Sequence, residues 1–184
     1  MLYEFEGRSP RISPEAFVHP LAVLIGRVTV EANCYVGAGA VLRGDLGAVM
    51  VGPGSNVQEN CVLHPMPERE VRLHQDTHVG HGCILHGCEL LPEVLVGMGS
   101  VISDGVKVNS RCLIGSGSLL LAGVEIPSDS VVTGRPAKVS KQLSPEQLEQ
   151  LRWSRSVYQD LARRYLKSFS QIPLEQDGLQ PVPG

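Results

Sequence analysis

The chain has 184 residues, a formal net charge of -3 and 19% charged residues, and it contains no apolar run close to the length of a membrane span. Nucleic-acid binding usually needs a basic stripe, so we expect neither a nucleic-acid partner nor a membrane segment. The N-terminal stretch has no signal-peptide pattern and the cysteines number 5, an odd count, which predicts reduced thiols in the cytoplasm. Aromatic residues make up only 4% while glycines number 20, which indicates a core of small, regularly packed side chains.

Aliphatic residues recur every six positions through most of the chain. We call these residues anchors: Val18, Leu24, Val30, Val36 and Leu42; Val51, Val57 and Leu63; Leu73, Val79, Leu85 and Leu91; and Val96, Ile102, Val108, Ile114, Leu120, Ile126 and Val132. A six-residue period with an aliphatic anchor is typical of a parallel β-helix, in which three hexads form a triangular coil of about eighteen residues and the coils stack into a prism. We therefore predict an all-β prism over residues 1–139.

The position two residues before an anchor also points into the prism and is mostly small. Four of the five cysteines fall there, namely Cys34, Cys61, Cys83 and Cys112. Free cysteine behaves as a small buried hydrophobic residue, so we interpret these four as packing residues. Cys88 lies outside the pattern and receives no assignment.

Breaks in the period and glycines predict the corners and loops. The phase breaks three times, at 42–51, 63–73 and 91–96. The second break predicts a polar loop over 65–72 that projects from the prism. We expect positive φ angles at four glycines of the corners: Gly26, Gly37, Gly80 and Gly97.

A helix is predicted to follow the prism. Ser144 is a suitable N-cap, Pro145 suits the first helical position, and Gln147 completes a capping box. Apolar residues then follow a helical stripe as far as Phe169. We expect a helix over about 145–169, within a segment 140–170 that packs along the outside of the prism. The tail over 171–184 is predicted to be extended.

The phase of the repeat brings histidines together. Leucine anchors three hexads apart lie on one face of successive coils, so the residues after them form an outward column: Arg43, His64 and His86. His64 and His86 can therefore share a metal ion. His81 lies at the corner before this face, where it can reach the column of a neighbouring chain. Three imidazoles around a tetrahedral ion, with one position left for water, form a catalytic zinc arrangement.

The alternative to a metal site is a chance ladder of two surface histidines. We interpret the remaining three histidines, His19, His74 and His78, as exposed side chains with no ligand role, with the alternative that His74 or His78 lines the mouth of a pocket.

Four motifs, in order, carry a resemblance to a known family: "VLRGD" at 41–45, "NVQEN" at 56–60, "VLH" at 62–64 and "VGHGCILHGC" at 79–88. The chain resembles the γ-class carbonic anhydrases of the left-handed β-helix superfamily over roughly residues 10–170. The segments "FVHPLAVLIG" and "VGMGSVI" look most similar to the PaaY-type phenylacetic-acid-degradation proteins and their carnitine-operon relatives. The resemblance implies a left-handed hexapeptide-repeat prism and a homotrimer with metals at its subunit interfaces.

The resemblance also implies a role for each matching residue. The metal ligands would be His64, His81 and His86, holding Zn2+ or another divalent transition metal such as Fe2+ or Co2+. Asn56 and Gln58 match residues near the metal-bound water, and Tyr158 matches a helix tyrosine near the pocket. The interface residues would be Arg43, Asp45 and Glu59, where Glu59 replaces the aspartate that is frequent in the family.

The function implied by the resemblance is attack of a metal-bound hydroxide on CO2, the reversible hydration to bicarbonate. Three alternatives stay open: a PaaY-type thioesterase that hydrolyses aromatic acyl-CoA esters, a hexapeptide acyltransferase that uses a single histidine as base, and a non-catalytic trimeric scaffold. The loop at 65–72 is short, with no counterpart of the acidic loop that active γ-class carbonic anhydrases can carry, so acyl-CoA hydrolysis stays in consideration.

Overall fold

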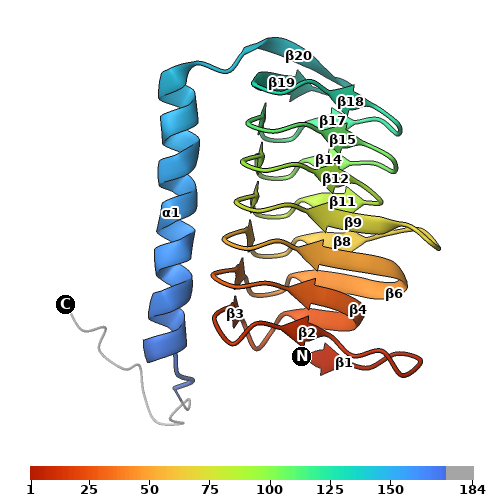
Figure 1. The fold of residues 1–184 in the computed structure, drawn as a ribbon, viewed down its shortest axis with the longest axis vertical. Helices are drawn as coiled ribbons and strands as arrows, with labels where there is room; N and C mark the ends of the chain where they lie inside the picture. Colours follow the sequence, from red (N-terminus) through yellow and green to blue (C-terminus); the bar gives the residue numbers. More distant parts are fainter. Residues whose placement is uncertain (173–184) are drawn as a thin grey trace, which may run out of the picture.

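The chain winds into a three-faced prism of stacked strands with one helix beside it, in a computed structural model that describes residues 1–172 (Figure 1). The predicted β-helix with a C-terminal helix is confirmed. Apart from residues 171 and 172, the tail predicted over 171–184 lies outside the described residues. Among the described residues, no helix is long and apolar enough to cross a membrane.

Three faces of strands make up the prism, and all their strand pairs are parallel except that of β19 with β20. Face one contains β1 (Leu2–Tyr3), β8 (Val62–His64), β11 (Ile84–His86), β14 (Val101–Ile102) and β17 (Leu119–Leu120). Face two contains β2 (Arg11–Ile12), β9 (Glu70–Leu73), β12 (Glu89–Leu90), β15 (Lys107–Val108) and β18 (Glu125–Ile126). Face three contains β3 (Phe17–Val18), β5 (Tyr35–Val36), β7 (Asn56–Val57), β10 (His78–Val79), β13 (Leu95–Val96), β16 (Leu113–Ile114), β19 (Ser130–Gly134) and β20 (Ala137–Gln142). The two long strands β4 (Val23–Val30) and β6 (Val41–Val51) turn a corner and belong to both face one and face two.

The strand register shows where the repeat departs from three hexads per coil. On face three, Leu95 pairs with Leu113, eighteen residues on, as three hexads require. Asn56 pairs with His78, twenty-two residues on, because the loop at 65–69 lengthens that coil. His78 pairs with Leu95, only seventeen residues on. The shortened coil lies close to the histidine motif and shifts its phase.

The predicted anchor at Leu91 is wrong, because Leu90 is the buried residue and lies in β12. The five-residue step therefore falls between Leu85 and Leu90 rather than after Leu91. Cys88 then lies two residues before an anchor and is buried like the other four cysteines. Every cysteine of the chain is thus a free thiol in the interior column of small residues.

The expectation for the corner glycines is correct only at Gly26, whose φ is +68°. Positive φ instead occurs three residues before the anchors, for example at Gly39 and Asn60. Gly37, Gly80 and Gly97 are needed for a different reason, namely close approach of the next coil. A Cβ on Gly97 would lie 2.5 Å from the backbone nitrogen of Ser116.

Helix α1 (Pro145–Ser168) packs along face three and runs from β20 back toward β3 (Figure 1). The predicted capping box is present: the Ser144 hydroxyl accepts from the Gln147 backbone, and the Gln147 side chain accepts from the Ser144 backbone. Six residues form the apolar contact between helix and prism: Phe17, Tyr35, Tyr158, Leu161, Ala162 and Tyr165. The β20 strand pairs antiparallel with β19 and leads the chain into this helix.

Candidate functional site

Two of the predicted ligands lie side by side on face one. His64 ends β8 and His86 ends β11, and the two are register partners in adjacent parallel strands. Their ring centroids are 5.2 Å apart, and His64 Nδ1 lies 3.2 Å from His86 Nε2. The column of Arg43, His64 and His86 is therefore present in the fold, since an Arg43 guanidinium nitrogen lies 3.3 Å from His64 Nδ1.

His64 carries a buried nitrogen with no hydrogen-bond partner among the described residues. That atom is Nε2, and although Asp45 Oδ1 lies 3.3 Å away, the two do not form a hydrogen bond. Burial and the nearby Arg43 lower the pKa of His64, so its imidazole is neutral near pH 7. A neutral, unpartnered ring nitrogen is what a metal ligand requires.

Asp45 forms an ion pair with Arg43 of the same chain. A guanidinium nitrogen of Arg43 lies 2.8 Å from Asp45 Oδ2, and the Leu46 backbone donates to Oδ1. Burial raises the pKa of Asp45, but these hydrogen bonds and the Arg43 charge outweigh it and lower the pKa below its ordinary value. The carboxylate therefore stays ionised beside His64.

Carboxylates also hold the other two histidines. His86 Nδ1 lies 2.9 Å from Asp104 Oδ1, and His81 Nδ1 lies 2.7 Å from Glu59 Oε2. The second Glu59 oxygen accepts from the Tyr35 hydroxyl at 2.7 Å. A carboxylate on Nδ1 fixes the tautomer that leaves Nε2 free as a ligand, the usual arrangement around metal-binding histidines.

A single chain does not bring the three histidines together. Over residues 1–172, no group of three His, Cys, Asp or Glu side chains is close enough to hold a metal ion. His81 follows β10 on face three, whereas His64 and His86 lie on face one. One chain thus presents a pair of histidines on one face and a single histidine at the preceding corner.

An apolar column runs along face one next to the histidine pair. Val62 and Ile84 are register partners that point outward and are 37% and 44% exposed. The column continues through Val101 and Leu119, which are half-buried. Paired β-branched residues of this kind on a flat parallel face suit contact with a second flat face.

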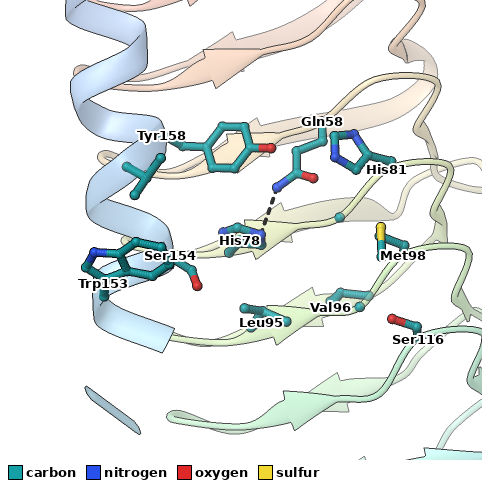
Figure 2. A pocket seen from close by; sticks show the side chains of 13 residues that line it. Gln58, His78, His81, Leu95, Val96, Met98, Ser116, Trp153, Ser154 and Tyr158 are labelled. Carbon is teal, nitrogen blue, oxygen red and sulfur yellow. Dashed lines mark hydrogen bonds between the residues drawn. The ribbon is translucent and has the colours of Figure 1, made fainter. Parts of the chain in front are cut away.

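A pocket of about 320 Å³ lies between face three and helix α1 (Figure 2). Its polar lining includes Gln58, His78 and His81, and its apolar lining includes Leu95, Met98, Trp153 and Val157. Tyr158 of the helix completes the wall, with its ring 5.3 Å from that of His78 and nearly perpendicular to it. The predicted residues Gln58 and Tyr158 therefore meet in one pocket, beside His81.

The interpretation of His78 as an exposed side chain is wrong. Gln58 Nε2 lies 2.7 Å from His78 Nε2, and Asn56 Nδ2 lies 3.2 Å from His78 Nδ1. Burial, with smaller contributions from His81 and Arg155, lowers the pKa of His78 to about 4, so its ring is neutral at pH 7. His19 and His74 lie outside the pocket, and His74 is instead paired with Glu89 on face two at 2.8 Å.

No family model matches the chain. The carnitine operon protein CaiE of Salmonella agona is 41% identical over 175 residues, which cover 95% of this chain and 88% of the relative, and CaiE of Salmonella newport matches equally. The chain belongs to the CaiE family.

Solved structures place this CaiE-family protein among the left-handed hexapeptide-repeat proteins. A Bacillus cereus protein named as a candidate acetyltransferase is 34% identical, with a TM-score of 0.88 over 90% of this chain and 96% of its own. A hexapeptide transferase family protein from Anaplasma phagocytophilum is 35% identical, with a TM-score of 0.86 over 89% and 97%. Hexapeptide-repeat proteins are typically trimers. The similarity to PaaY-type proteins in particular stays an expectation.

Two site residues of this CaiE-family protein were missed by the sequence reasoning. Asp104 follows the anchor Ile102 by two residues, and Glu59 and His81 follow their anchors by the same step. That shared corner position was a usable signal for Asp104. His78 directly precedes its anchor on face three, and the helix packed over that face half-buries this outward position.

Proposed function

We propose that this CaiE-family protein is a metal-dependent enzyme of the γ-carbonic-anhydrase type, in which two neighbouring chains complete each site. His64 and His86 of one chain and His81 of the next would hold Zn2+, or Fe2+ or Co2+. The observation that carries the proposal is the buried, unpartnered Nε2 of His64 beside His86. Such an atom costs stability unless it gains a partner in the assembled protein.

The donor set fits a borderline transition metal. Imidazole nitrogens suit zinc and its neighbours, and three of them leave a coordination position open. Asp104 and Glu59 each lie on Nδ1 of a proposed ligand, which leaves Nε2 for coordination. The apolar column at Val62 and Ile84 gives face one a surface to bury against the neighbouring chain.

The residues of the chain would divide the work around such an ion. When bound, the metal would supply Lewis acidity, lowering the pKa of a coordinated water to near 7. Gln58 would orient a reacting oxygen through its buried amide, and Arg43 would keep Asp45 ionised beside His64. Tyr158 and the apolar residues of the pocket would exclude bulk water from the reaction. The first reaction to test is the reversible hydration of CO2 to bicarbonate.

Hydrolysis of an acyl-CoA thioester is the second candidate, and the pocket favours it. CO2 is far smaller than a cavity of about 320 Å³ with apolar walls. Leu95, Met98 and Trp153 form a lining suited to an apolar or aromatic acyl group. The same Lewis acid could serve either reaction, since both involve attack of a water oxygen on an electrophilic carbon.

The names of the structural relatives raise acyl transfer as a third candidate, in which one histidine would act as base. His78 is the half-buried histidine that Gln58 contacts in the pocket, but a pKa of about 4 makes it a weak base at neutral pH. Acyl transfer therefore ranks below the two metal-dependent reactions.

A mixed-trimer experiment tests the proposal. His81→Ala protein and His64→Ala/His86→Ala protein are each expected to bind no metal. Mixed trimers of the two should regain one complete site, because one chain supplies the pair and the next supplies His81. Metal content by mass spectrometry, with CO2 hydration and acyl-CoA hydrolysis on the same sample, provides the readout. Failure to regain metal, or a stable metal-bound monomer by light scattering, would contradict the shared site, and full metal without turnover would favour a scaffold.

A further inference from the structure

We propose that His78 is a positioning residue that fixes the direction of the Gln58 amide, so that the Gln58 carbonyl oxygen rather than its N–H faces the reacting centre. The inference rests on the proposed function only for the reacting oxygen that Gln58 would orient. The arrangement of the two side chains is visible in Figure 2, where the Gln58 nitrogen points to His78 and its oxygen lies on the opposite side.

Both hydrogens of the Gln58 amide have a partner. Nε2 of Gln58 donates to Asn56 Oδ1 at 3.1 Å and to His78 Nε2 at 2.7 Å. Turning the amide over would place its oxygen against Asn56 Oδ1, and two acceptors would then face each other. In the observed orientation, neither Asn56 nor His78 donates a hydrogen bond to the Gln58 oxygen, which is therefore free to accept one from another group.

The imidazole determines this direction because a neutral ring accepts at only one nitrogen. If His78 Nε2 accepts from Gln58, the ring proton is on Nδ1. Asn56 Nδ2 then lies 3.2 Å from a protonated Nδ1, so this longer contact brings two donors together and is not a hydrogen bond, whereas the shorter contact to Gln58 carries the hydrogen bond. The opposite tautomer would donate from Nε2 and would require the Gln58 oxygen to face the ring.

Burial keeps water from competing for these groups. Asn56 and Gln58 are 1% and 2% exposed, and the Tyr158 ring covers His78 edge-on. Helix α1 holds Tyr158 in place through the apolar contact with Tyr35 and Phe17. A hydrogen-bonded chain closed off in this way keeps one orientation, since a flipped amide could not be satisfied by solvent.

The consequence for chemistry is that Gln58 acts as a hydrogen-bond acceptor. Its oxygen would take the hydrogen of a water or hydroxyl group in the pocket and so direct the lone pairs of that oxygen toward the substrate carbon. No proton is transferred to Gln58 or His78 in this scheme. In this scheme His78 takes no part in the bond changes and acts on the reacting oxygen only through Gln58.

Nitrogen NMR of histidine-labelled, metal-free protein tests the tautomer directly. The signal of His78, assigned by its loss in His78→Gln, is expected to show the proton on Nδ1 at pH 7. In Gln58→Ala the same signal should move toward a mixture of tautomers. A proton on Nε2, or an unchanged signal in Gln58→Ala, would overturn the proposal. This readout needs no turnover, so it remains decisive even if the proposed function fails.

Kinetics on the metal-loaded trimer test the coupling. His78→Phe is expected to lower kcat by about tenfold to a hundredfold while KM changes by less than about twofold, and His78→Gln should recover most of the loss. In a Gln58→Ala background, His78→Phe should change kcat by less than about twofold, because the two residues act as one unit. His74→Phe on face two is the matched control with unchanged kcat. Fully multiplicative losses in the double variant would show that His78 does not act through Gln58.

Discussion

Oδ1 of Asp104 lies 2.9 Å from Nδ1 of His86, although the two residues are 18 apart in sequence and lie on successive coils of the prism. Ile102 and Leu85, the anchors that precede them, are register partners in β14 and β11. Asp104 follows its anchor by two residues and therefore reaches back from a corner to the histidine on the neighbouring coil. The contact fixes the ring so that Nε2, the nitrogen on the side of His64, is free of its proton.

Asp104→Asn is the variant that tests this contact. An amide can still hydrogen-bond to His86 but no longer strengthens its basicity, so metal affinity should fall by about 10–100-fold with the trimer intact. Competition with a chelator of known affinity measures the change. Asp129→Asn is the control, since Asp129 pairs with Arg111 on a distant coil. Equal affinities for both variants would remove Asp104 from the site.

Single alanine variants separate ligands from bystanders. His64→Ala, His81→Ala and His86→Ala should each lose bound metal, because each removes one of only three donors. His74→Ala and His78→Ala should keep it, since His74 pairs with Glu89 and His78 with Gln58. Metal-to-protein ratios of the purified trimers give the answer. Full metal in His81→Ala would show that neighbouring chains do not share the site.

Much of the fold was predictable because the anchor pattern is local. A hexad with an aliphatic anchor specifies one edge of the prism wherever it occurs, and the capping box at Ser144 specifies where α1 begins. The error at Leu91 arose where two adjacent leucines offered equivalent anchors and only the register with β9 and β15 chooses Leu90. Local pattern cannot decide such a case.

The site was less predictable because it depends on contacts between distant segments. The column of His64 and His86 follows from counting hexads, and the structure has it. The half-buried position of His78 depends instead on helix α1, which begins 67 residues later and covers face three. The residues next to His78 in the sequence do not indicate that a helix packs over it, so the sequence pattern predicted an exposed side chain.

The low pKa of His78 predicts how stability depends on pH. The folded pKa is about 4 and the unfolded value is about 6.5, so between these values the unfolded chain binds a proton that the folded chain does not. Stability should therefore be fully present above pH 6.5 and fall as the pH drops toward 4, by up to about 3 kcal/mol per chain. Urea unfolding of metal-free protein from pH 4.5 to 7.5 measures this slope.

His78→Gln should remove that part of the slope, because glutamine does not titrate. His74→Gln should keep the slope that comes from His78. His64, whose pKa is also lowered, contributes to the slope equally in both variants. A slope in His78→Gln as steep as that of His74→Gln would show that His78 is not buried in its neutral form.

Gly97→Ala tests the close approach of adjacent coils. The new methyl carbon would lie 2.5 Å from the Ser116 nitrogen and 2.8 Å from the Ile114 oxygen, both backbone atoms that cannot move without shifting a strand. We expect a loss of about 1–3 kcal/mol or more in the free energy of unfolding. Gly117→Ala is the control, since Gly117 has a φ of +68° but nothing within 4 Å, so only backbone strain of about 1–2 kcal/mol applies. A smaller shift in urea midpoint for Gly97→Ala than for Gly117→Ala would contradict the packing argument.

Gln58→Ala tests the chemistry of the pocket. Gln58 is buried beside His78 and lines the cavity that His81 borders, but an amide is a poor zinc ligand beside imidazoles. Its removal should therefore leave metal content and the trimer intact, while turnover falls by about 10²–10³, the usual cost of losing one oriented hydrogen bond at a reacting oxygen. Both CO2 and an aryl-acyl-CoA must be tried, because the variant is informative only where the parent protein has activity.

Gln58→Glu keeps an acceptor oxygen and should lose less turnover than Gln58→Ala if the carbonyl oxygen is the atom that contacts the reacting group. Wild-type turnover by a metal-loaded Gln58→Ala trimer would reduce Gln58 to a packing residue of the prism.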